Sequence, residues 1–169
     1  MISDKLQKAL NDQIAAELWS SNLYLQMSFF LKHEGWDGSA CWMAHQAEEE
    51  RGHALKMADY LLGRGGAATL QVTDAVPQVW GSVLEIFEHT YEHECKVSSM
   101  VNAIVALAIE EKDYATENFF RGFVDEQVEE EETARGFIDA LEKIGDNGYG
   151  LYMFDKELAA RTYNIPSPL

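Results

Sequence analysis

The stretch Glu50-Arg-Gly-His53 places a glutamate and a histidine three positions apart within a long segment of helical periodicity. Residues three apart share one face of an α-helix, so both side chains would project in the same direction. An inward-facing Glu-x-x-His is how a helical bundle presents a carboxylate and an imidazole to a pair of metal ions. One such motif is more often a solvent-facing pair, so its meaning depends on what other segments bring beside it.

The surrounding sequence predicts four long helices and one short helix. Hydrophobic residues make up 47% of the 169 residues, which favours a packed core, and only three prolines interrupt the chain. The apolar residues of the first segment recur at the period of an amphipathic helix: Ile2, Leu6, Leu10, Ile14, Leu18, Leu25 and Phe29. The apolar stripe of the second segment comprises Trp42, Ala44, Leu55, Ala58 and Leu62. Helices are expected at about residues 4–34, 38–63, 82–111, 114–144 and 149–160.

Residues 64–81 differ from the segments on either side. Ala67-Ala-Thr-Leu-Gln-Val-Thr73 favours extended backbone, and Pro77 would interrupt a helix in the remainder of the segment. Eighteen extended residues span roughly 55–60 Å at about 3.3 Å each. A helix of 27 residues is only about 40 Å long. The connection can therefore return along the whole bundle, and the third helix can run parallel to the second. The expected fold is all-α, a four-helix bundle with one long crossover and a short C-terminal helix, forming a single domain over residues 1–169.

The candidate ligands fall at similar levels along this bundle. Glu17 lies about 13 residues above the start of the first helix, and Glu50 lies about 13 above the end of the second. Glu94 lies about 16 residues above the end of the third helix, while Gln127 and Glu130 lie about 13 and 16 above the start of the fourth. A spread of three residues is less than one helical turn. Four glutamates and one histidine can therefore meet in one layer.

The cost of burial makes that layer a candidate metal site. A buried, unpaired carboxylate is unfavourable by several kcal/mol, and several together repel one another. A divalent or trivalent cation supplies the opposite charge. Carboxylates with a single imidazole suit iron or manganese better than structural zinc, which would favour cysteine.

Four further residues have two open interpretations. Tyr24 follows Glu17 by seven residues and shares its face, either as a core tyrosine or as a hydrogen-bond partner or electron donor at the site. Glu49, Glu126 and Glu129 are about 100° around the helix from the ligand candidates. They form either a solvated acidic face or an accessory metal site.

Charge and composition exclude other classes. A net charge of −16 argues against nucleic acid and anionic membrane partners. Cys41 and Cys95 have no metal or redox spacing and are expected to be small buried residues, which fits a reducing cytoplasm. The start of the chain lacks a signal-peptide apolar region, and the longest apolar run, residues 103–109, is too short to span a bilayer. We therefore expect a cytoplasmic protein without a membrane partner.

With these features the chain resembles the bacterial non-haem ferritins over about residues 3–160. The matching motifs are Ala-Ala-Glu17-Leu-Trp-Ser-Ser, Glu-Glu-Glu-Arg-Gly-His53, Tyr-Glu-His-Glu94, Glu126-Gln-Val-Glu-Glu130 and Gly-Leu-Tyr-Met-Phe-Asp-Lys-Glu157. The resemblance implies a ferritin-like bundle, 24 identical subunits around a hollow that stores ferric mineral, and a ferroxidase centre in each subunit. It also implies that the fifth helix lines the fourfold axis.

The resemblance further implies the role of each site residue. One iron would be bound by Glu17, Glu50 and His53, and the second by the bridging Glu50 with Glu94 and Glu130. Gln127 would form a hydrogen bond near the oxygen-binding side. A third iron site would comprise Glu49, Glu126, Glu129 and Glu130.

Differences from related proteins narrow the expected function. The fourth segment carries Gln127-x-x-Glu130 instead of a second Glu-x-x-His, so the second iron has no histidine and is expected to be the more labile. Arg51 stands where haem-binding relatives place methionine, so no haem is expected. We expect a ferroxidase that uses O2 or H2O2. The alternatives are a di-iron oxidase of an organic substrate and a catalytically inactive shell subunit.

Overall fold

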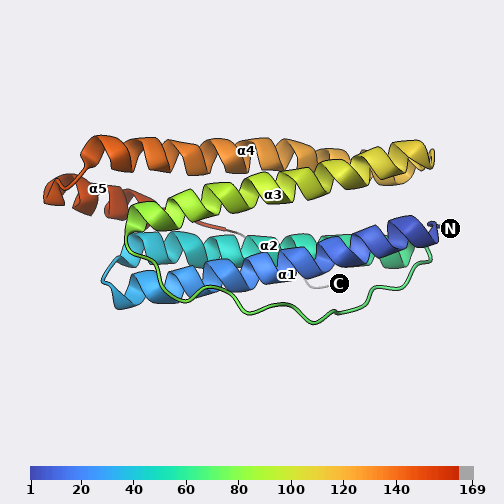
Figure 1. Cartoon of the computed structure of the whole chain (residues 1–169), viewed down its shortest axis with the longest axis horizontal. Helices are drawn as coiled ribbons and strands as arrows, with labels where there is room; N and C mark the ends of the chain where they lie inside the picture. The colour runs from blue at the N-terminus through green and yellow to red at the C-terminus, as the bar shows by residue number, and fades with distance from the viewer. Residues whose placement is uncertain (164–169) are drawn as a thin grey trace.

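The computed structural model describes residues 1–163, and within them all regular structure is helical. Four long helices lie side by side, and a short fifth lies at one end (Figure 1). Their bounds are α1 (Asp4–His33), α2 (Asp37–Gly63), α3 (Val83–Glu110), α4 (Tyr114–Ile144) and α5 (Gly148–Leu158). The predicted all-α fold is confirmed, and every predicted helix boundary lies within two residues of the observed one.

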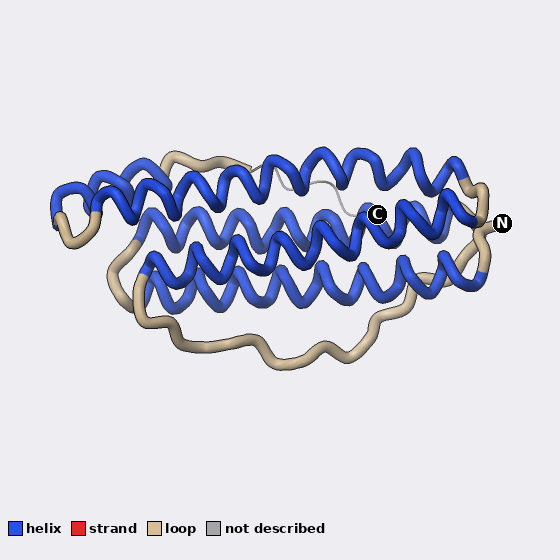
Figure 2. The backbone as a smooth tube through the Cα atoms, turned by 45° about the horizontal axis from the view of Figure 1, so that its top comes forward, coloured by secondary structure: helices blue, strands red, loops and turns tan. Residues whose placement is uncertain are grey.

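The long connection between α2 and α3 crosses the full length of the bundle. Helix α1 is antiparallel to α2, and α3 is antiparallel to α4, whereas α2 and α3 run in the same direction (Figures 1 and 2). The loop is tied to α1 by Asn11, whose side chain donates to the Ala67 carbonyl at 2.9 Å and accepts from the Thr69 amide at 2.8 Å. The Asn11 amide thus supplies the backbone partners that an extended segment otherwise lacks.

The turn between α3 and α4 is tight and is fixed by an ion pair. Lys112 takes a left-handed backbone conformation with φ of 57°, and Asp113 caps α4 by accepting from the Thr116 amide at 3.0 Å. Arg64, directly after α2, donates to both carboxylate oxygens of Asp113, at 3.1 and 2.9 Å. This two-armed contact joins the end of α2 to the start of α4.

The core corrects part of the predicted apolar face of α1. Leu25 and Phe29 are 39% and 58% exposed. Each step of four residues advances about 40° beyond one full turn, so the steps that end at Leu18 and Phe29 carry the predicted line away from the buried one. The buried apolar residues of α1 are Leu6, Leu10, Ile14, Leu23, Tyr24, Met27 and Leu31.

The predicted stripe of α2 is also displaced. Of its five residues only Trp42 is buried, and Leu62 is half exposed. The buried face of α2 carries polar residues between its apolar ones. The apolar residues alone therefore predicted a face that lies beside the buried one. The buried residues of α2 include Met43, Gln46, Ala47, Glu50, His53, Ala54, Met57 and Leu61.

The structure also shows how the two cysteines are buried and where the fifth helix docks. Cys41 and Cys95 are half-buried rather than buried, because their neighbours Trp42 and Glu94 take the inward positions. One face of α5 docks on its own bundle through Phe154 and Leu158, which belong to the same buried apolar cluster as Trp42.

The α5 contact extends to the start of α2. Asp155 accepts from the backbone amides of Gly38 and Ser39 at 2.9 and 2.7 Å, so it caps the first turn of α2. A Cβ at Gly38 would lie 1.6 Å from the Asp155 carbonyl oxygen. Only glycine therefore allows this approach.

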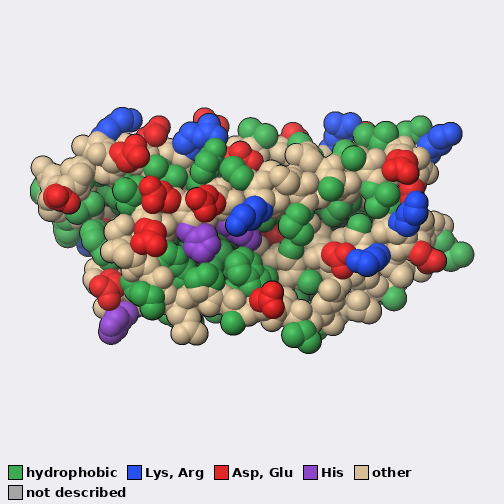
Figure 3. Space-filling view, in the orientation of Figure 1, with side chains coloured by type: hydrophobic (Ala, Val, Ile, Leu, Met, Phe, Trp, Pro, Cys, Tyr) green, Lys and Arg blue, Asp and Glu red, His purple; other side chains and the backbone are tan. Residues whose placement is uncertain are grey.

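The surface carries the acidic side chains that the net charge of −16 implies. Acidic side chains are scattered over the face shown in Figure 3, with basic and apolar side chains between them, instead of forming one acidic cluster. Among residues 1–163, no helix is both long enough and apolar enough to cross a bilayer.

Replacing Arg64 tests the clamp between α2 and α4. Arg64→Ala should lower the free energy of unfolding by about 1–3 kcal/mol, because it leaves the capping carboxylate of Asp113 without its cation. Lys8→Ala, which breaks the exposed pair with Asp12, is the control and should cost under about 0.5 kcal/mol. Thermal midpoints at one protein concentration measure both. Equal shifts would contradict the clamp.

Candidate metal centre

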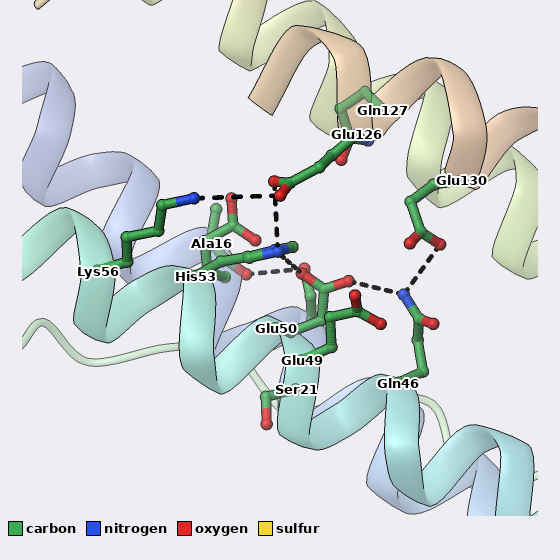
Figure 4. Close-up of polar contacts among 12 residues, drawn as sticks. Ala16, Ser21, Gln46, Glu49, Glu50, His53, Lys56, Glu126, Gln127 and Glu130 are labelled. Carbon is green, nitrogen blue, oxygen red and sulfur yellow. Dashed lines mark hydrogen bonds and ion pairs between the residues drawn. The ribbon is translucent and has the colours of Figure 1, made fainter. Parts of the chain in front are cut away.

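Glu17 of α1 meets Glu50 and His53 of α2 in the interior of the bundle. Each residue offers a ligand atom, and these atoms lie within 4.8 Å of one another. Glu17 is 1% exposed, Glu50 3% and His53 9%. Glu50 and His53 project from the same side of α2, with His53 Nδ1 3.3 Å from Glu50 Oε2 (Figure 4). The three side chains offer oxygen and nitrogen ligands to one cation.

Each of the two glutamates is held by a glutamine one turn earlier. Gln13 Nε2 donates to Glu17 Oε1 at 2.7 Å, and Gln46 Nε2 donates to Glu50 Oε1 at 3.1 Å. The other oxygen of Glu17 is buried and has no hydrogen-bond partner among the described residues. A buried carboxylate oxygen that lacks a donor fits a cation ligand, because an unsatisfied buried acceptor is otherwise costly.

Helices α3 and α4 contribute the remaining inner residues. Glu94 is 1% exposed and accepts from the Tyr24 hydroxyl at Oε1 and from Gln127 Nε2 at Oε2, the latter at 2.9 Å. Glu130 is half-buried and accepts from Gln46 Nε2 at 3.1 Å. Because Gln46 also donates to Glu50, its amide links α2 to α4 (Figure 4).

Burial and neighbouring charges raise the pKa values of the four carboxyl groups. Burial, with the charge of Glu50, raises the pKa of Glu17 well above its usual value. Burial and the charges of Glu94 and Glu130 do the same to the pKa of Glu50. Burial raises the pKa of Glu94, and burial with Glu94 and Glu49 raises the pKa of Glu130 to about 7. A bound cation would favour the charged forms that burial disfavours.

Tyr24 is fully buried and lies between this group and a histidine. Burial and the charge of Glu94 raise the pKa of the Tyr24 phenol, so it stays protonated and donates. Its ring meets that of His93 edge-on, with centroids 5.9 Å apart. Burial lowers the pKa of His93 to about 4, and Ser20 lies 2.7 Å from its Nε2. His93 is therefore a neutral imidazole behind Tyr24.

Of the outer carboxylates Glu49, Glu126 and Glu129, the first two lie next to basic side chains. Glu126 Oε2 is 3.6 Å from His53 Nε2, and Glu126 Oε1 is 4.0 Å from Lys56 Nζ (Figure 4). Glu49 Oε2 is 2.5 Å from a guanidinium nitrogen of Arg161. Glu129 is exposed to solvent. The structure thus brings Glu49 and Glu126 against the inner group and leaves Glu129 outside it.

Sequence reasoning missed several residues that hold the ligands in place. For the glutamines a signal existed, because Gln13 and Gln46 each precede a candidate ligand by four positions and so share its face. No such signal marks Arg161, which lies beyond the last helix and reaches the site only through the path of the chain.

Comparisons with known proteins agree with this architecture. A family model described as a ferritin-like domain matches residues 7–144. A bacterial non-heme ferritin of Bacteroides fragilis (strain 638R) is 53% identical over 161 residues, 95% of this chain and 100% of the relative. A probable bacterial non-heme ferritin-like protein of Haemophilus influenzae is 40% identical, covering 94% and 96%. The structure of an engineered closed form of the Archaeoglobus fulgidus ferritin superposes with a TM-score of 0.95 at 42% identity, covering 97% and 100%.

The stability of the metal-free protein should fall as pH rises from about 5 to 8. The pKa of Glu130 is about 7 in the folded chain, against about 4.3 when unfolded, so the folded state binds more protons in this window. Unfolding therefore becomes easier by on the order of 1–3 kcal/mol as pH rises. Glu130→Gln should reduce this slope, whereas Glu132→Gln, at an exposed position of α4, should not. Thermal midpoints of chelator-treated protein measure the effect, and an undiminished slope in Glu130→Gln would refute it.

Proposed function

The chain belongs to the ferritin family, and we propose that it stores iron and oxidises Fe(II) to Fe(III) with O2 or H2O2 at its buried carboxylate–histidine group. The observation that carries this proposal is the convergence of Glu17, Glu50 and His53, with a buried Glu17 oxygen that has no donor. Iron is the cargo and the substrate, so the ligands must bind it and later release it.

Two iron positions follow from the inner residues. We assign the first to Glu17, Glu50 and His53, and the second to Glu50, Glu94 and Glu130. Glu50 is the shared ligand, and its pKa responds to Glu94 and Glu130 as well as to Glu17. The second position has only carboxylates, so iron there would be the more labile.

A paired site makes a two-electron step available. Two Fe(II) ions give one electron each to one molecule of O2, which with two protons becomes H2O2, and the carboxylates stabilise the ferric product by charge. Tyr24 and Gln127 each donate to Glu94 and so fix the orientation of that ligand. The buried position keeps the reacting ions away from bulk water.

Further assignments extend this function. We assign a third iron position to Glu49, Glu126, Glu129 and Glu130, which would receive ions leaving the inner pair.

We also propose a hollow shell of 24 identical subunits in the cytoplasm, without haem. The proposal of no haem rests on Arg51, which stands where haem-binding relatives place methionine. Size-exclusion chromatography tests the shell, and a monomer or dimer would instead favour an oxidase of an organic substrate.

Glu50→Ala should abolish rapid iron oxidation, because both iron positions lose a ligand. Stopped-flow absorbance after mixing Fe(II) with aerobic metal-free protein should show a fast ferric signal that saturates near two irons per subunit in the native chain. Glu92→Ala, at an exposed position of α3, is the control and should behave as the native chain. Equal slow oxidation in the native chain and in Glu50→Ala would leave a passive shell subunit as the function.

Glu129→Ala should separate the third position from the inner pair. Its side chain is exposed and makes no contact with Glu17, Glu50 or His53, so the first oxidation phase should stay largely intact. Later turnovers should change, because ions leaving the inner pair lose a ligand on their way out. The same stopped-flow trace, continued through repeated iron additions, measures both phases. Unchanged kinetics in both would exclude Glu129 from iron handling.

A further inference from the structure

The chain after α5 turns back along the bundle (Figures 1 and 2). Arg161 lies in this returning segment, three residues beyond the end of α5, and contacts one face of α2. Among residues 1–163, no other arginine and no lysine forms a polar contact with both an inner and an outer residue of the site.

Four contacts fix the Arg161 guanidinium. Nη2 donates to Glu49 Oε2 at 2.5 Å, and Nη1 donates to Gln46 Oε1 at 2.8 Å and to the Trp42 carbonyl at 3.2 Å. The guanidinium also lies over the Trp42 ring, 4.3 Å from its centroid. The side chains of Arg161 and Glu49 are only 19% and 23% exposed, so this is not a loose surface pair. The planar fork of arginine suits such a set of acceptors, and lysine could not reproduce it.

Arg161 also sets the orientation of Gln46. An amide oxygen that accepts from Arg161 leaves the amide nitrogen to face the opposite way. That nitrogen donates to Glu50 and to Glu130, each at 3.1 Å. Arg161 is therefore connected through one side chain to ligands of both proposed inner iron positions.

Tyr163 shows that the returning segment lies in the field of the same carboxylates. Burial and the charges of Glu49, Glu50 and Glu126 raise the pKa of the Tyr163 phenol. Together with the contacts of Arg161 to Gln46 and Glu49, this places the returning segment beside the site.

We propose that Arg161 is a built-in counter-ion, which occupies Glu49 so that a cation binding at the outer carboxylates must displace the guanidinium. A second positive charge at Glu49 weakens cation binding there, because the two cations compete for one carboxylate and repel each other. The inner group, whose hydrogen-bond donors among the described residues are neutral apart from its own histidine, meets no such competitor. The segment thereby favours filling of the inner pair before the outer position. This inference rests on the proposed function for the identity of the cation.

Calorimetric titration of the assembled, metal-free protein with Zn²⁺, a cation that is not oxidised, tests the proposal. In Arg161→Ala the outermost binding step should tighten by roughly fivefold to tenfold, because a nearby positive charge is lost. The inner steps should stay within about twofold of the native values. Arg161→Lys keeps the charge but loses the fork, so its outermost step should lie between those of the native chain and Arg161→Ala.

Two control variants test whether the effect is specific to the pair of Arg161 and Glu49. Arg121→Ala breaks an ion pair of the same 2.5 Å length on the exposed side of α4, and it should leave every binding step unchanged. On a Glu49→Gln background, Arg161→Ala should have no further effect, because the carboxylate for which the two cations compete is already gone.

The outcomes separate this inference from the proposed function. Tight inner binding with an outermost step that is the same in the native chain and in Arg161→Ala would overturn the role of Arg161 and leave the inner iron site intact. Equal tightening in Arg121→Ala would also overturn it, because the effect would then be general charge. Loss of inner binding in the native chain itself would instead refute the proposed function, and this inference with it.

Discussion

The burial of three carboxyl groups in one layer is the constraint around which the bundle is arranged. Glu17, Glu50 and Glu94 are each no more than 3% exposed, and burial raises the pKa of each, with the charge of Glu50 acting on Glu17 and that of Glu94 on Glu50. Such a layer opposes folding of the metal-free chain, so stability must come from elsewhere. The apolar core accordingly forms two clusters, one on each side of the polar layer. One is built around Tyr24, Trp42 and Phe87 at the α5 end, and the other around residues such as Leu10, Met57 and Phe120 at the opposite end.

The donors around the carboxylates differ between the inside and the outside of the site. Inside, neutral groups such as Gln13, Gln46 and Gln127 satisfy single oxygens. A neutral amide relieves part of the cost of burial without cancelling the negative charge, which remains available to a cation. Outside, Lys56 and Arg161 are full charges next to Glu126 and Glu49. The inner group is thus prepared for a metal ion, while the outer carboxylates already have counter-ions from the chain.

The parts of this structure that sequence could predict are those fixed by local geometry. The helix boundaries and the matching levels of Glu17, Glu50 and Glu94 follow from the constant rise of an α-helix, which is independent of its neighbours. The inward line of α2 could not be predicted from apolar residues, because Gln46, Glu50 and His53 occupy it. The exposure of Leu25 and Phe29 depends on angular offsets of a fraction of a turn that add along the helix, and an apolar pattern does not resolve them. Arg161 depends on where the chain travels after α5, and no local pattern encodes that path.

The position of α5 links local helix geometry to the path that the chain takes after its last helix. Asp155 caps α2 at Gly38 and Ser39, and Phe154 joins the cluster around Trp42, so α5 is held at the start of α2. From that anchor Arg161 is only three residues beyond Leu158, which limits how far along α2 the guanidinium can reach. The apolar docking of a short helix, which has no metal ligand of its own, thereby determines which carboxylate of the site receives a counter-ion. Packing at one end of the bundle and charge at its centre are therefore coupled through a few residues of backbone, and the chemistry of the outer carboxylates depends on the stability of the α5 contact.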